Sequence, residues 1–207
     1  MDALLLVDIQ NDFVPGGALA VPGGESVVPV ANHLMSRFTH VVASQDWHPA
    51  DHRSFAAQHP GHQVGDTVPL NGQPQILWPT HCVQHTHGAA LCDTLNTDKI
   101  TQLITKGTNP EIDSYSAFFD NGHLQETGLH GYLQSHGVRS LTVLGLATDY
   151  CIKYTVLDAL ELSYRVVVVL DGIRAVNLNS EDGNVALREM SNAGATLMES
   201  TQLPPSR

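Results

Sequence analysis

The chain has 207 residues and a mass of 22.4 kDa, and 42% of its residues are hydrophobic, which is enough to bury one sizeable core. Ten Lys and Arg against 21 Asp and Glu give a formal charge of −11, which argues against nucleic acid or an anionic membrane as the main partner. Twelve histidines are a high count for this length and indicate metal or acid–base chemistry.

Short apolar runs alternate with helical patterns along the chain, as in parallel sheets built from strand–helix–strand units. The strands that we expect are 3–7, 40–44, 101–105, 140–144, 165–170 and 195–198. The helices that we expect are 25–38, 149–163 and 180–193. We therefore predict an α/β fold with one domain over residues 1–207, in which helices flank a mostly parallel, six-stranded, doubly wound sheet.

Residues 45–98 interrupt this alternation. They are rich in His, Pro, Gly and Asn and show no clear period. A connection of this length is seldom idle, so we expect a functional insertion after the second strand, packed over one edge of the sheet.

The three cysteines, Cys82, Cys92 and Cys151, are an odd number in a chain of this size. The N-terminus lacks the basic region and long apolar run of a signal peptide, and no stretch approaches the roughly 18 apolar residues of a membrane span. We therefore expect free thiols in a reducing, cytoplasmic setting.

Reactive residue types follow several predicted strands, where a parallel sheet places its ligand crevice. Asp8 follows the first strand, Lys106 the third, and Cys151 lies at the start of a helix after the fourth, with Thr148 as the expected N-cap. A helix N-terminus stabilises a thiolate, a carboxylate can take the thiol proton, and a lysine can offset the charge. Taken singly, Asp8 could be a carboxylate that caps the following loop, Lys106 a solvated cation, and Cys151 a small buried residue.

A second group lies in the insertion. Asp46 and His48 are two residues apart, so an extended segment directs both to one face, and His81 is a candidate third ligand. One carboxylate and two imidazoles suit Zn, Fe or Mn and leave positions open for water or substrate. The other histidines of the insertion are expected in solvated loops, with His52 the least secure case. These residues are His52, His59, His62, His85 and His87.

Five motifs together resemble a known family. They are Val-Asp-Ile-Gln-Asn-Asp-Phe at 7–13, Asp-Trp-His-Pro at 46–49, Trp-Pro-Thr-His-Cys-Val at 78–83, Lys-Gly at 106–107 and Gly-Leu-Ala-Thr-Asp-Tyr-Cys at 145–151. They are similar to those of the isochorismatase-like cysteine hydrolases, and the second and third motifs to those of the bacterial nicotinamidases within them. The resemblance runs from residue 3 to about residue 198.

The resemblance implies a role for each matching residue. The catalytic triad would be Asp8, Lys106 and Cys151; the metal ligands Asp46, His48 and His81; the aromatic walls around the substrate ring Phe13, Trp78 and Tyr115; and the oxyanion donors the amides of Ala147 and Cys151. The Ala147–Thr148 bond matches the position of a cis peptide in the family. Whether His52 adds a further metal ligand stays open.

The expected reaction is hydrolysis of nicotinamide, and of pyrazinamide, to the acid and ammonia through a cysteine thioester, with one divalent metal, Zn before Fe or Mn. The resemblance places this reaction in NAD salvage. An amidase acting on a carbamoyl or ureido substrate is the alternative, and metal content separates the two. A vinyl-ether-cleaving isochorismatase has no need of Cys151, and a dinucleotide-binding module requires a Gly-x-Gly-x-x-Gly turn where this chain has Asp8-Ile9-Gln10. The choice between monomer and homo-oligomer stays open.

Overall fold

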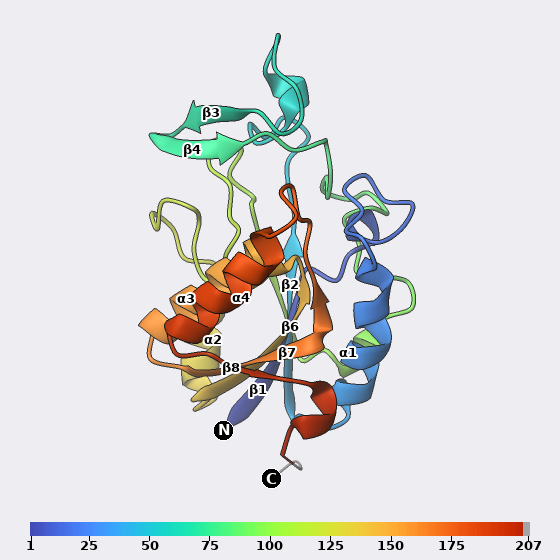
Figure 1. Cartoon of the computed structure of the whole chain (residues 1–207), viewed down its shortest axis with the longest axis vertical. Helices are drawn as coiled ribbons and strands as arrows, with labels where there is room; N and C mark the ends of the chain where they lie inside the picture. Colours follow the sequence, from blue (N-terminus) through green and yellow to red (C-terminus); the bar gives the residue numbers. More distant parts are fainter. Residues whose placement is uncertain (205–207) are drawn as a thin grey trace.

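Six parallel strands form the central sheet of the computed structural model, which describes residues 1–204 (Figure 1). Their order across the sheet is β5-β2-β1-β6-β7-β8. The strands are β1 (Asp2–Val7), β2 (His40–Asp46), β5 (Gln102–Lys106), β6 (Ser140–Leu146), β7 (Arg165–Arg174) and β8 (Thr196–Met198). The predicted fold class is therefore confirmed.

The chain reverses its direction of travel across the sheet between β1 and β6, which pair in register from Asp2↔Ser140 to Val7↔Gly145. In open α/β sheets, the ligand crevice lies beyond the carboxyl ends of the strands at such a switch point. The residues that follow β1 and β6 therefore lie at the position where a site is expected.

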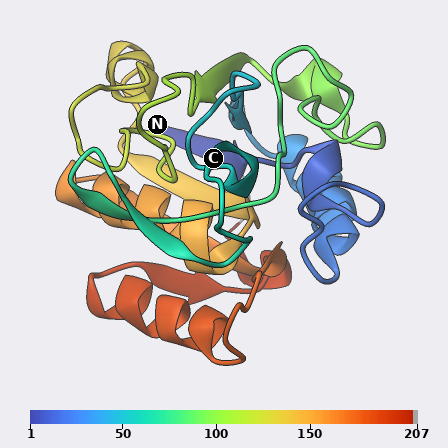
Figure 2. The same ribbon diagram turned by 90° about the horizontal axis from the view of Figure 1, so that it is seen from above.

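Helices cover both faces of the sheet. The helix α1 (Val27–Met35) packs on one face, and α2 (Leu129–Ser135), α3 (Lys153–Glu161) and α4 (Asp182–Asn192) lie on the other (Figures 1 and 2). The middle strands are sealed between these layers: from Ala3 to Val7 no residue of β1 is more than 1% exposed. None of the helices within residues 1–204 has the length and apolarity needed to span a bilayer.

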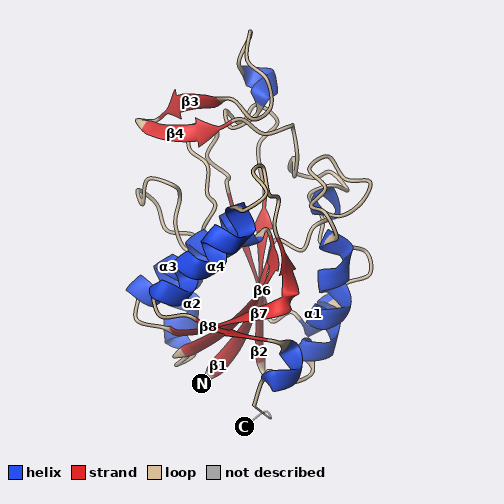
Figure 3. Cartoon of the chain, viewed as in Figure 1, coloured by secondary structure: helices blue, strands red, loops and turns tan. Residues whose placement is uncertain are grey.

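The insertion after β2 stands above the carboxyl edge of the sheet and is mostly loop (Figure 3). It holds a small antiparallel hairpin of β3 (Thr67–Leu70) and β4 (Gln73–Ile76), and the short 3-10 turns Ala56–Gln58 and Thr97–Lys99. Three further 3-10 turns lie outside it, at Asn11–Phe13, Gly24–Ser26 and Ser200–Gln202.

Several predicted boundaries were wrong. Both β6 and β7 run past their expected ends because the apolar run does not mark the last hydrogen-bonded residue, and β7 continues through Asp171-Gly172 to Arg174. The helix α2 was not predicted, because Gly131 interrupts its pattern and only Leu129 and Leu133 of its residues are buried. The expected helix 149–163 is regular only from Lys153, after a wide π turn over Thr148–Ile152.

Candidate active site

Lys106 is the centre of a buried charged cluster at the carboxyl edge of the sheet. Its side chain is fully buried, and its Nζ lies 2.9 Å from Asp8 Oδ2 and 2.5 Å from Asp46 Oδ1. It also donates to the Ser114 carbonyl at 2.7 Å and lies 3.5 Å from Cys151 Sγ. The register Asp46↔Lys106 between β2 and β5 puts this carboxylate and this ammonium side by side.

Asp8 follows β1 in a left-handed backbone conformation, with φ of 50°. Its Oδ1 accepts a hydrogen bond from Ser44 Oγ at 2.6 Å, and its carboxylate, the Asp46 carboxylate and Cys151 Sγ each place an atom within 4.8 Å of the other two. On the neighbouring strand, a Cβ at Gly145 would lie 2.0 Å from the Val7 carbonyl oxygen, so only glycine allows β6 to approach β1 this closely. The glycine thus brings the two strand ends together.

Cys151 lies within the wide turn between β6 and α3. The Ala147 carbonyl accepts hydrogen bonds from the Tyr150 and Ile152 amides, both at 3.1 Å, and not from the Cys151 amide between them. Ala147 takes the cap position, and Thr148 makes no side-chain cap, so the predicted N-cap was wrong. The cis peptide is Leu146–Ala147 and not Ala147–Thr148, one residue earlier than expected, at the observed end of β6.

Burial and the Lys106 ammonium set the protonation of the cluster. Burial raises the pKa of Cys151 well above its usual value, and Lys106 only partly opposes this. Burial likewise raises the pKa of Asp8 against the pull of Lys106. Burial alone lowers the pKa of Lys106, but the carboxylates of Asp46 and Asp8 outweigh it and hold the pKa well above its usual value. The cluster therefore holds a neutral thiol beside a lysine that stays charged.

Asp46, His48 and His81 form a second buried group on the insertion side of Asp46. Asp46 Oδ2 lies 3.6 Å from His48 Nε2 and 3.9 Å from His81 Nε2. The Nδ1 atoms of the two rings lie 2.8 Å from the Gly107 carbonyl and 2.7 Å from the Pro79 carbonyl, respectively. With Nδ1 held by a carbonyl, each ring directs its Nε2 at the carboxylate.

These three residues fit a metal ion. His48 Nε2 is buried and has no hydrogen-bond partner, which is costly unless another group binds it. Burial, and then His48, lower the pKa of His81 to about 4, so its ring is neutral at neutral pH and available as a ligand. Although burial opposes it, Lys106 and then His48 lower the pKa of Asp46, which keeps the carboxylate ionised. The buried Asp/His group could therefore bind a metal.

His52 is not in a solvated loop, as was expected, but fully buried against His48, with ring centroids 4.3 Å apart. Its Nδ1 lies 2.7 Å from Ser54 Oγ, and its Nε2 is buried without a partner. Together with Asp113, His48 and His52 form a second group of the kind that could hold a metal. Of the other insertion histidines that were expected in solvated loops, His62, His85 and His87 are exposed, and His59 is half-buried.

A small cavity of about 30 Å³ joins the two groups, with Cys151 in one wall and His81 and Asp46 in another. Trp78 and Tyr115 form an aromatic side, where Trp78 Nε1 donates to the Tyr115 hydroxyl at 3.1 Å. The other lining residues are Phe13, Leu19, Val21, Asp113, Ala147, Tyr150 and Val176. Every candidate residue from the sequence therefore lies at or beside this cavity, with Asp8, Lys106 and His48 directly behind its walls.

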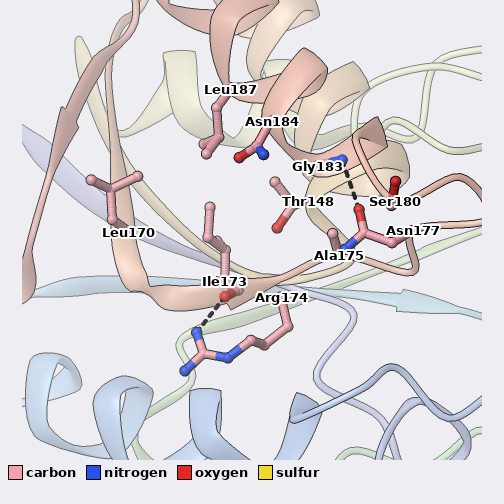
Figure 4. Close-up of a pocket in the computed structure, with 10 residues that line it drawn as sticks. All are labelled: Thr148, Leu170, Ile173, Arg174, Ala175, Asn177, Ser180, Gly183, Asn184 and Leu187. Carbon is pink, nitrogen blue, oxygen red and sulfur yellow. Dashed lines mark hydrogen bonds between the residues drawn. The ribbon is translucent and has the colours of Figure 1, made fainter.

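A larger cavity of about 210 Å³ lies on the other side of the wide turn, between β7 and α4 (Figure 4). Thr148 and Asn177 line it, and Gly183 N–H donates to Asn177 Oδ1 at 2.9 Å. It contains none of the candidate catalytic or metal-binding side chains. Volume and candidate residues therefore point to different cavities, and the candidate residues gather at the smaller one.

Sequence reasoning missed three polar residues beside the cavity. Asp113 lines it, the Ser114 carbonyl holds Lys106, and Gln75 of β4 donates to Tyr115 Oη at 3.1 Å and to Asp113 Oδ2 at 3.3 Å. All three are at least 96% buried. Asp113 and Ser114 lie in a loop, and Gln75 lies in a short strand of the insertion hairpin, so no sequence period marks any of them.

The fold and the site define an α/β protein in which a buried thiol, a carboxylate and an ammonium meet at the switch point of the sheet. A family model described as the isochorismatase domain matches residues 2–202, and the chain belongs to this family.

Within this family, the chain is similar to proteins named as nicotinamidases. The chain is 56% identical to a nicotinamidase of Escherichia coli K12 over 199 residues, which cover 94% of this chain and 93% of the relative. It superposes on an Acinetobacter nicotinamidase/pyrazinamidase structure with a TM-score of 0.95 and 42% identity, covering 98% of each chain.

Two further similar structures contain bound ligands. PnC1 from L. infantum, in complex with nicotinate, is 37% identical with a TM-score of 0.86, covering 99% of this chain and 95% of its own. A pyrazinamidase of Pyrococcus horikoshii, in complex with zinc, is 34% identical with a TM-score of 0.78, covering 96% and 98%.

Proposed function

We propose that this protein is a nicotinamidase, which hydrolyses nicotinamide, and pyrazinamide as a close analogue, to the carboxylic acid and ammonia. The observation that carries the proposal is the shared position of Cys151, Asp8 and Lys106 at one end of a cavity whose other end is the Asp46–His48–His81 group. The relatives' names, and the nicotinate bound in the L. infantum structure, support the same substrate class.

Cys151 is the nucleophile in this proposal, and Asp8 is the base. Asp8 takes the thiol proton as the sulfur attacks the amide carbon, so that the S–C bond forms while the carbonyl oxygen becomes an oxyanion. The amides of Ala147 and Cys151 receive that oxyanion. Asp8 then gives its proton to the leaving ammonia as the C–N bond breaks. Water, deprotonated in turn by Asp8, hydrolyses the thioester and restores the thiol.

Lys106 stabilises the charged steps. Its ammonium lies against Asp8 and 3.5 Å from Cys151 Sγ, so it favours the thiolate as it forms. Because it remains charged, it also offsets the carboxylate of Asp8 between proton transfers. A cluster buried from water makes these interactions stronger than they would be at the surface.

Asp46, His48 and His81 would hold one divalent ion, with zinc the best match for one carboxylate and two imidazoles and Fe or Mn as alternatives. When bound, this ion supplies a Lewis-acidic position for the pyridine nitrogen of the substrate. Phe13, Trp78 and Tyr115 supply flat apolar walls for the ring. These contacts orient the ring so that its amide carbon lies next to Cys151 Sγ, and this orientation lowers the barrier to attack.

Ammonia release from nicotinamide, with and without a chelator, tests the proposal. The metal-loaded protein should release ammonia and nicotinate in equal amounts, and chelation should slow the release strongly. Benzamide, a primary amide of nearly the same shape that lacks the ring nitrogen, is the matched control substrate and should release ammonia far more slowly. A metal-loaded protein that releases no ammonia from nicotinamide would overturn the proposed function.

A further inference from the structure

The segment that follows β1 carries two polar side chains, Gln10 and Asp12, that the proposed chemistry does not use. They alternate with Asp8 in the motif Asp-Ile-Gln-Asn-Asp at 8–12. Gln10 is fully buried, and a buried side-chain amide needs all of its hydrogen-bonding atoms satisfied. Each side chain has a hydrogen-bond partner in the backbone of a candidate metal ligand or of its neighbour, Asp46 for Gln10 and Cys82 for Asp12.

Gln10 holds the backbone of Asp46 on both sides. Its Oε1 accepts the Asp46 N–H at 2.8 Å, and its Nε2 donates to the Asp46 carbonyl at 2.8 Å. The same Nε2 donates to the Ala89 carbonyl at 2.8 Å. The two bonds to Asp46 fix the peptide planes before and after this residue, and therefore the direction in which its carboxylate leaves the chain.

Asp12 holds the backbone that carries the two histidines. Its Oδ2 accepts the Cys82 N–H at 2.7 Å, which fixes the peptide plane between His81 and Cys82. The Cys82 carbonyl in turn accepts the His48 N–H at 3.0 Å. A Cβ at Gly88 would lie 2.2 Å from Asp12 Oδ2, so only glycine leaves room for this carboxylate.

We propose that Gln10 and Asp12 are positioning residues for the metal site, which set the placement of Asp46, His48 and His81 through the backbone. This inference rests on the proposed function, because it assigns the role of two residues at the same site. Groups that orient metal ligands change metal affinity by about 10- to 100-fold when they are removed. Neither side chain would touch the ion or the substrate.

Gln45 offers a matched control for Gln10. It is also a buried glutamine, and its Nε2 donates to the same Ala89 carbonyl, at 2.7 Å. It makes no side-chain bond to the backbone of Asp46. Gln10→Met and Gln45→Met therefore both remove a buried amide from Ala89, and only Gln10→Met releases Asp46.

The experiment titrates zinc-loaded proteins with EDTA at a temperature well below melting and measures the zinc retained after desalting. The EDTA concentration that removes half of the zinc should be at least about tenfold lower for Gln10→Met than for the wild type. For Gln45→Met, this concentration should lie within about threefold of the wild-type value. Equal values for the two variants, or a Gln10→Met protein that holds zinc like the wild type, would overturn the proposal. A wild-type chain that takes up no zinc would overturn it as well.

Asp12 gives a second arm that does not depend on whether Gln10→Met folds. Asp12→Ala removes the acceptor of the Cys82 N–H and should weaken zinc retention about tenfold, whereas Asp12→Asn keeps one amide oxygen for this bond and should recover most of the loss. Zinc retention in Asp12→Ala equal to that of the wild type contradicts the proposal. The titration contains no nicotinamide, so a zinc-binding protein that releases no ammonia defeats the proposed function alone.

Discussion

The two ends of the cavity are built in different ways. The sheet end consists of residues that follow regular strands, Asp8 after β1 and Lys106 at the end of β5, with Cys151 in the turn after β6. The insertion end consists of His48, His81 and the aromatic Trp78, all in loops. Asp46, the last residue of β2, belongs to both, since one oxygen binds Lys106 and the other faces the histidines.

This difference assigns the two tasks of the proposed enzyme to two kinds of structure. Bond making requires that the reacting groups stay close together even before the substrate binds, and buried parallel strands hold them in this way. Substrate choice depends on walls and ligands that can change without disturbing the sheet, and loops provide those. The comparison predicts that damage at the sheet end lowers kcat, and that damage at the insertion end raises KM.

Removal of the proposed nucleophile should have the largest effect. Cys151→Ala should lower kcat for ammonia release by at least about 1,000-fold, because no other group can form the covalent intermediate. Zinc content and the thermal melt should stay as in the wild type. Cys92→Ala, a buried thiol in the insertion outside both cavities, is the control and should keep its kcat. A Cys151→Ala protein with more than about a hundredth of the wild-type kcat contradicts the assignment.

Lys106→Met should damage both activity and stability. It leaves the buried carboxylates of Asp8 and Asp46 without their cation, and breaking a buried ion pair on one side costs about 3–5 kcal/mol. Chemical denaturation measures this loss, and kcat should fall with it. Lys99→Met, at an exposed lysine, should change neither quantity. A Lys106→Met protein as stable as Lys99→Met would show that the sheet end does not depend on this charge.

His81→Ala should raise KM for nicotinamide by about 10- to 100-fold and should weaken zinc retention, since it removes one proposed ligand at the insertion end. It is a cleaner test than a change at Asp46, because His81 makes no contact with Lys106 among the described ion pairs. Alkylation of Cys151 by iodoacetamide should continue at close to the wild-type rate. Loss of alkylation together with zinc would show that the two ends are not separable.

The smallest effect concerns the rates at which two thiols react, Cys151 in the wall of the cavity and Cys92 in the insertion outside it. Burial, and then Asp93, raise the pKa of Cys92 to about 11. Its thiolate fraction, and so its labelling by iodoacetamide, should rise about tenfold for each pH unit between 8 and 10. Cys151 lines the cavity beside Asp8 and should label faster at pH 8, with protection by nicotinamide. Peptide mapping by mass spectrometry gives both rates, and faster labelling of Cys92 at pH 8 would place the reactive thiol elsewhere.

The sequence predicted the sheet end better than the insertion end. Apolar runs that stop at Asp8 and Lys106 mark both the strands and the edge at which their side chains meet, so fold and convergence follow from one pattern. The insertion has no such period, so the hairpin β3–β4, the burial of His52 and the place of Asp113 depend on tertiary contacts that short-range patterns do not encode. The wide turn at Thr148–Ile152 was missed for the same reason, because its i→i+5 bonding has no distinct sequence signal.

The most direct test of the division between the two ends compares nicotinamide with benzamide, which has the same shape but no ring nitrogen. The zinc-loaded protein should hydrolyse benzamide far more slowly than nicotinamide. Removal of the metal should slow ammonia release from nicotinamide strongly and leave the slow release from benzamide nearly unchanged, because Asp8, Lys106 and Cys151 still perform the chemistry. If benzamide hydrolysis falls as steeply as nicotinamide hydrolysis when the metal is removed, the insertion end takes part in bond making and the division is wrong.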